Sequence, residues 1–264
     1  MLTQKVIAQQ IFDNFSRLEN PLDANMNLIG ITLEGKRINP DVRYFSQLQE
    51  VLIDYEKLVE DMNTAYFMYR DIYRKNDLRY DITVIPFAKI GREYNKTLGH
   101  YHPLAINGLS YPEIYQVIYG NATYVLQKKD YSTNRVIDVK IVEAQEGDIV
   151  VILPNYGHVT VNKKSDLLIM SNVVYCNFES DYSDYKKKKG AYAYITKEGI
   201  IKNSNYDEQL EISVIKAKDF NKHFVRNTFG KEIDILTSLI YSSDKLEFLK
   251  NPLLLKSQTI LNNH

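Results

Sequence analysis

The most informative segment of the chain reads Glu93-Tyr-Asn-Lys-Thr-Leu-Gly-His-Tyr-His-Pro103. It contains two of the five histidines of the chain, His100 and His102, as a His-x-His pair. On a β-strand, residues two apart point to the same face, so the pair directs both imidazoles to one place. This spacing makes the stretch a candidate metal site on a strand.

Two further residues of metal-ligating type lie downstream. Glu113 begins the segment Glu113-Ile-Tyr-Gln-Val, and His158 follows the turn Pro154-Asn-Tyr-Gly157. Three imidazoles and one carboxylate suit a divalent first-row transition metal and leave coordination positions open for water or substrate. A His-x-His pair by itself is more often an unrelated surface pair, but here all candidates lie beside or close to a turn glycine or proline. We therefore predict that His100, His102, Glu113 and His158 hold one metal ion.

The surrounding sequence, from about residue 78 to residue 175, alternates short segments rich in Val, Ile and Tyr with turn residues. Gly120-Asn121 and Gly147-Asp148 are typical of tight turns between strands. Many short strands separated by such turns indicate an antiparallel sandwich or a small barrel. The expected strands are 80–85, 114–118, 122–127, 136–143, 148–153, 159–162 and 167–175.

The two ends of the chain differ from this β-rich centre. Apolar residues recur mostly at four-residue spacing from Leu2 to Phe15 and predict a helix, which Asn20-Pro21 ends. Residues 27–39 predict a strand or two, residues 41–74 give a mixed pattern, and the sequence after Asp219 is helical again with a break at Asn251-Pro252. We expect a helical or irregular extension at 1–42, a β-domain at 43–205 and a helical extension at 206–264.

Composition limits the function classes. The 264 residues carry 33 Lys+Arg and 33 Asp+Glu, and this formal net charge of +0 argues against sequence-independent nucleic-acid binding. The single cysteine, Cys176, cannot form an internal disulfide and is given no role. No apolar run reaches the roughly 18–20 residues of a membrane helix, and the first residues do not read as a secretory signal. We therefore expect a cytoplasmic protein that binds neither nucleic acid nor a membrane.

Several segments, in order, resemble the cupin-type glucose-6-phosphate isomerases of archaea and some bacteria. The segments are Leu78 to Pro86, Glu93 to Pro103, Ser110-Tyr-Pro-Glu-Ile-Tyr-Gln-Val117 with Gly120, Glu146 to Pro154, and Tyr156-Gly-His-Val-Thr-Val-Asn162. The resemblance covers roughly residues 43 to 200. It implies a mainly β fold, the cupin double-stranded β-helix or jelly-roll barrel, to which the helical ends are extensions.

The resemblance also assigns residues. It implies metal ligands at His100, His102, Glu113 and His158, although His102 and Glu113 are farther apart than is usual in the family. Thr83, Thr97 and Gly99 match the phosphate end of the substrate site, Tyr111 and Tyr115 lie near the sugar, and Tyr182 matches a tyrosine after the second motif, with Tyr185 close by. Glu113 and Tyr115 are the residues expected to act in catalysis. An isolated threonine is more often an ordinary strand residue, and most of the 21 tyrosines must serve in packing.

The activity that the resemblance implies is the interconversion of glucose 6-phosphate and fructose 6-phosphate. It requires one divalent metal ion per subunit (Fe, Mn, Ni or Zn), with either an enediol route through Glu113 or a direct hydride shift. The phosphate would be bound by neutral donors, with the Lys186–Lys189 run as the alternative. Three other interpretations stay open: another sugar-phosphate isomerase or epimerase, another cupin chemistry such as an oxygenase, and a non-catalytic sugar-phosphate-binding module. A homodimer is expected because sheet edges need covering and because the resemblance implies one.

Overall fold

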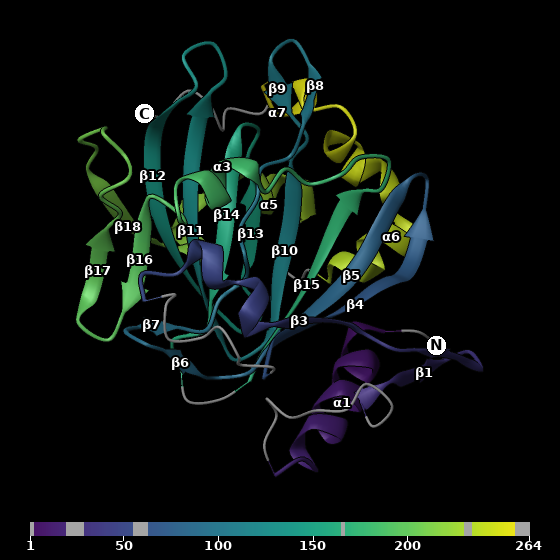
Figure 1. Ribbon diagram of the computed structural model, residues 1–264. Coiled ribbons are helices and arrows are strands. Elements are labelled where there is room, and N and C mark those ends of the chain that lie inside the picture. Colours follow the sequence, from purple (N-terminus) through teal and green to yellow (C-terminus); the bar gives the residue numbers. More distant parts are fainter. Residues whose placement is uncertain (1–2, 20–28, 55–62, 165–166, 230–233, 257–264) are drawn as a thin grey trace.

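The computed structural model describes residues 3–19, 29–54, 63–164, 167–229 and 234–256. Two sheets dominate it (Figure 1). The larger has the strand order β13 (Ile149–Ile152), β10 (Glu113–Tyr119), β15 (Leu168–Tyr175), β5 (Leu78–Ile85), β4 (Thr64–Lys75) and β3 (Asp41–Tyr44). The smaller has the order β14 (Tyr156–Val161), β11 (Asn121–Asp130), β12 (Arg135–Gln145) and β18 (Ile212–Lys216).

The chain crosses between these sheets repeatedly. From β10 in the larger sheet it passes to β11 and β12 in the smaller, back to β13, across to β14 and back to β15. The two sheets face each other, because the Tyr115 ring of β10 lies 5.6 Å from the Tyr124 ring of β11. Alternate crossing between two facing antiparallel sheets is a jelly roll. The predicted jelly-roll barrel is therefore confirmed, and each of the seven strands expected between residues 80 and 175 is present, with bounds shifted by a few residues.

Smaller sheets, hairpins and helices accompany the two main sheets. A four-stranded sheet has the order β17 (Gly199–Lys202), β16 (Ala193–Thr196), β7 (Glu93–Tyr94) and β6 (Lys89–Ile90). Two hairpins are formed by β1 (Ile31–Leu33) with β2 (Lys36–Ile38), and by β8 (Leu104–Ile106) with β9 (Leu109–Ser110). Short 3-10 helices lie at Phe45–Gln47, Gln49–Val51 and Ser243–Leu249, and helix α3 spans Ser183–Lys187.

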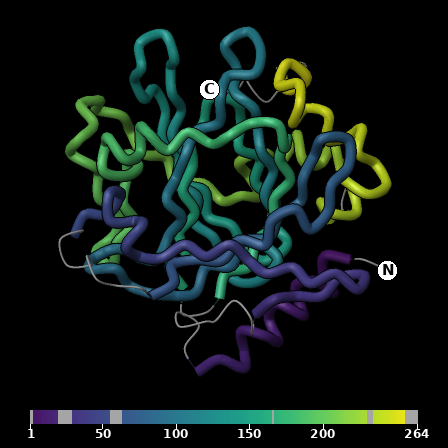
Figure 2. Tube along the Cα trace, turned by 45° about the vertical axis from the view of Figure 1, so that its right-hand side comes forward, coloured from purple at the N-terminus to yellow at the C-terminus, as the bar shows by residue number. Residues whose placement is uncertain are grey.

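Helices from both ends of the chain cover the outer face of the six-stranded sheet. Gln4 of α1 (Gln4–Ser16) is buried and exchanges hydrogen bonds with Gln116, Tyr80 and Ser171 on three adjacent strands. The backbone N–H of Ile235, which begins α6 (Ile235–Tyr241), donates to the same Gln116 side chain. Figure 2 shows these terminal segments, coloured purple and yellow, outside the barrel wall. The terminal helices therefore cover only the outer face of this sheet, and its inner face lies inside the barrel.

The C-terminal part is not purely helical. Before α4 (Ala217–Phe220) and α5 (Lys222–Phe229), strand β18 adds to the edge of the smaller sheet, in parallel with β12. Helix α7 (Leu253–Lys256) follows the break at Asn251-Pro252. The domain limits of 43–205 stay a prediction, and β18 shows that chain beyond residue 205 contributes to the sheet. No helix within the described ranges has both the length and the apolar character that crossing a membrane requires.

Candidate metal centre

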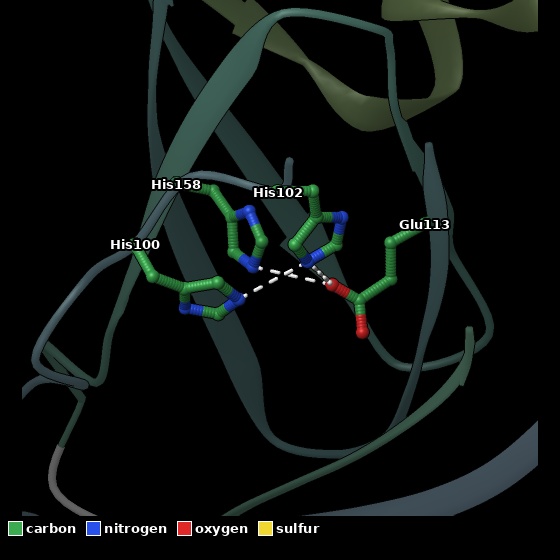
Figure 3. Close-up of side chains that lie close together, drawn as sticks. All are labelled: His100, His102, Glu113 and His158. Carbon is green, nitrogen blue, oxygen red and sulfur yellow. Dashed lines mark hydrogen bonds and ion pairs between the residues drawn. The ribbon is translucent and has the colours of Figure 1, made fainter. Parts of the chain in front are cut away.

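The four predicted ligands converge inside the barrel (Figure 3). One ligand atom from each of His100, His102, Glu113 and His158 lies within 4.8 Å of the others. The shortest separations are 3.2 Å between the Nε2 atoms of His100 and His102, and 3.4 Å from Glu113 Oε2 to the Nε2 atoms of His102 and His158. Neighbouring ligand atoms that share one metal at about 2.0–2.2 Å lie about 3.0–3.6 Å apart, so these three separations fit neighbouring ligands of one ion.

Different elements bring the four side chains together. Glu113 begins β10 on one sheet and His158 lies on β14 of the other, while an isolated antiparallel bridge pairs His100 with His158. The His-x-His pair lies in an irregular segment with isolated bridges rather than in a strand, which differs from the sequence prediction. The i, i+2 spacing still directs both rings to one side. His102 Nδ1 donates to the Tyr111 carbonyl at 2.9 Å, which directs Nε2 toward Glu113.

The charge state of the cluster fits a cation. Burial lowers the pKa of His102 to about 4 and holds the pKa values of His100 and His158 well below their usual range, so all three imidazoles are neutral, as metal ligation requires. Burial also raises the pKa of Glu113 to about 8. Its Oε2 atom is buried without a hydrogen-bond partner in the described structure, and a bound cation would satisfy it and favour the carboxylate.

A cavity of about 500 Å³ opens from this cluster. The predicted substrate residues that line it are Thr83, Thr97, Gly99, Tyr115 and Tyr182. The Thr97 hydroxyl accepts a bond from the Thr160 N–H at 2.9 Å, which leaves its own proton available to a ligand. Gly99 has φ = +87°, and a Cβ there would lie 2.5 Å from Val159 Cγ2, so glycine is required by both conformation and space.

Of the four tyrosines singled out in the sequence, two line the cavity and two do not. The Tyr115 hydroxyl lies 3.1 Å from His158 Nε2, and the Tyr182 ring centre lies 5.4 Å from that of His100. Tyr111 precedes the strand rather than sharing its face and does not line the cavity; its ring stacks on Phe178 at 5.1 Å. Tyr185 is fully buried and packs against Tyr101, away from the cavity lining. Of the two candidates after the second motif, Tyr182 is therefore the one that faces the cavity.

The cavity wall also contains polar residues that the sequence analysis did not identify. They are Arg70, Arg79, Asp81, Asn172, Glu179 and Ser180. Arg79 forms an ion pair with the buried Asp81 at 2.9 Å, and Asn172 Nδ2 donates to Glu113 Oε1 at 2.7 Å. Asp81 and Asn172 are register partners on β5 and β15. Asp81 and Asn172 are polar residues within largely apolar strands, which is the one local feature that singles them out in the sequence. The partner of each side chain depends on the strand register, which the local sequence does not show.

The chain is similar in sequence to known proteins of one family. Residues 42–211 match the family model described as glucose-6-phosphate isomerase. The chain belongs to the glucose-6-phosphate isomerase family. It is 27% identical to the glucose-6-phosphate isomerase of Thermococcus gammatolerans over 164 residues, covering 60% of this chain and 80% of that protein. It is 25% identical to the glucose-6-phosphate isomerase of Thermococcus kodakarensis over 190 residues, covering 70% of this chain and 94% of that protein.

Solved structures overlap with parts of this family member. A Lactobacillus farciminis oxalate decarboxylase–formate complex aligns with a TM-score of 0.33 and 20% identity, over 44% of this chain and 30% of that chain. A cupin-2 domain protein from Shewanella frigidimarina aligns with a TM-score of 0.25 and 16% identity, over 39% of this chain and 76% of that chain. Both overlaps cover less than half of the chain.

Proposed function

We propose that this protein interconverts glucose 6-phosphate and fructose 6-phosphate at a divalent transition metal held by His100, His102, Glu113 and His158. The observation that carries the proposal is the convergence of these four residues on one point at the base of a polar cavity, in a chain of the glucose-6-phosphate isomerase family. Three imidazoles and a carboxylate can bind divalent first-row transition metals, and the candidates are Fe, Mn, Ni and Zn.

The residues that line the cavity are proposed to bind different parts of the substrate. A metal at this position would act as a Lewis acid and stabilise negative charge on the C1 and C2 oxygens. Burial holds the pKa of Tyr115 well above its usual range, so its hydroxyl stays protonated and serves as a hydrogen-bond donor rather than as a base. Thr83, Thr97 and Gly99 lie elsewhere on the cavity wall and are proposed to bind the phosphate. Glu113 is the group that can move a proton between the carbons in an enediol route.

The test is a coupled assay for formation of glucose 6-phosphate from fructose 6-phosphate. We expect activity in the wild type and its loss in His158→Ala. His223→Ala, in α5 and outside the cavity lining, is the matched control and should keep full activity. Fructose without phosphate should be a poor substrate. Binding of sugar phosphates by the metal-loaded protein without turnover would instead favour the non-catalytic module.

We also propose a cytoplasmic homodimer. The edge strand β18 pairs on one side only within the described ranges, and Val214 at its centre is 54% exposed. An apolar edge strand of this kind is stabilised when a second chain covers it. Light scattering at micromolar concentration should give twice the chain mass, and Val214→Lys should shift the distribution toward monomer. A monomeric wild type would contradict this assembly.

A further inference from the structure

Asn172 is an exception within its strand. Strand β15 is central in the six-stranded sheet, and residues 168–174 are all buried. Asparagine is depleted in strands, and a buried amide without partners is costly. Packing alone would therefore favour a β-branched apolar side chain, such as the neighbouring Val173 and Val174. The position of Asn172 requires another explanation.

Its side chain explains the geometry of Glu113. The register places Asn172 beside Tyr115 on β10, one step along the strand face from Glu113, and the amide spans this diagonal. Asn172 Nδ2 donates to Glu113 Oε1 at 2.7 Å. The other carboxylate oxygen, Oε2, then lies 3.4 Å from the Nε2 atoms of both His102 and His158. One oxygen is fixed by the amide and the other is directed to the ligand cluster.

We propose that Asn172 is a positioning residue that orients Glu113 for metal binding. The inference rests on the proposed metal centre and adds a residue to it. An ionised carboxylate accepts hydrogen bonds but cannot donate them, so the amide N–H of Asn172 matches the state of Glu113 that binds a metal. On its other side, Asn172 lies next to Asp81, which is neutralised by Arg79. A neutral donor between two carboxylates orients one of them without adding charge.

The experiment compares Asn172→Val with wild type, using Co²⁺ as the probe and its visible absorption as the readout. Valine removes the donor but suits a buried strand. The control is Asn203→Val, because Asn203 is also buried and its amide donates to the carbonyls of Lys188 and Ala191, outside the cavity lining. Co²⁺ affinity is measured by competition with a chelator, and stability is measured by urea unfolding of the metal-free proteins. Asn172→Ser is a second variant in case valine impairs folding.

The three variants should separate metal binding from stability. Asn172→Val and Asn172→Ser should bind Co²⁺ about 10-fold to 100-fold more weakly than wild type, the usual effect of losing a group that orients a ligand. Metal-free Asn172→Val should lose less stability than Asn203→Val, because it removes one hydrogen bond to a carboxyl group whereas Asn203→Val removes two to backbone carbonyls. Asn203→Val should show the reverse pattern, with lower stability and unchanged affinity.

Two results would overturn the inference. One is Co²⁺ affinity in both Asn172 variants within twofold of wild type. The other is loss of stability in metal-free Asn172→Val equal to that of Asn203→Val, which would make Asn172 a structural residue. A wild type that binds no Co²⁺ would instead refute the metal centre itself, so the two failures are distinguishable.

Discussion

Thr97 is the residue at which phosphate recognition is most directly tested. Its hydroxyl accepts the Thr160 N–H and can donate into the cavity. A hydrogen bond to a charged acceptor is worth about 1.5–3 kcal/mol, so Thr97→Val should raise KM for fructose 6-phosphate about 10-fold to 100-fold with Co²⁺ affinity unchanged. Thr196→Val is the matched control, because Thr196 is buried but bonds the Gly199 carbonyl instead. An unchanged KM in Thr97→Val would place the phosphate elsewhere.

At the residue scale, the convergence of the four proposed ligands could be predicted from the sequence, and the residues that bond to them or lie around them could not. A His-x-His pair, a strand-initial glutamate and a histidine after a turn are local patterns with a chemical meaning. The Asn172–Glu113 bond and the Arg79–Asp81 pair in the cavity wall depend on which strands are neighbours and in what register. That information is not local, so these residues could not be assigned from the sequence.

The segment that leads into the His-x-His pair is held by a buried ion pair. Lys96 and Glu93 bond each other, and they also bond the Val51 carbonyl and the Ile53 N–H respectively. Removing one member leaves a buried charge without its partner, so Lys96→Met should lower the free energy of unfolding by about 3–5 kcal/mol. Glu93→Gln/Lys96→Met should recover part of that loss. Urea unfolding checks both, and a loss below about 0.5 kcal/mol in Lys96→Met would show that the pair is not stabilising.

At the element scale, strands were predicted correctly where apolar residues follow a regular pattern between turn residues, and they were missed where no such pattern is present. The strands from β10 to β15 have alternating or continuous apolar residues bounded by turns, and they were predicted. The His-x-His segment was expected in a strand, but it takes an irregular path because Gly99 has a positive φ and packs against Val159 and Tyr185. Strand β18 was not predicted, because its partner β12 lies about 70 residues away in the sequence.

For the whole molecule, the buried site makes the stability of the metal-free protein depend on pH. Burial raises the pKa of Glu113 from 4.5 to about 8, so the folded state retains a proton that the unfolded state has lost, and stability falls as pH rises through this window. The three histidines have lowered pKa values and act in the opposite direction, because the stability that they contribute as neutral groups is lost as pH falls below about 6.5. Above pH 6.5 the Glu113 effect therefore dominates within the site.

This balance gives a measurable difference between two metal-free proteins. Between pH 6.5 and about 8, the melting temperature of wild type should fall relative to that of Glu113→Gln, whose amide does not ionise. Thermal unfolding at several pH values in excess chelator checks this. Parallel curves for the two proteins would show that Glu113 ionises in the metal-free fold without cost.

The most direct test of the central claim is a titration of isomerase activity with metal. Metal-free protein is mixed with increasing equivalents of a divalent transition metal, and the rate of glucose 6-phosphate formation from fructose 6-phosphate is followed. We expect no activity without metal, a linear rise to a break at one equivalent per chain, and no rise in His158→Ala. Full activity of wild type in excess chelator, with metal content shown to be nil, would contradict the central claim.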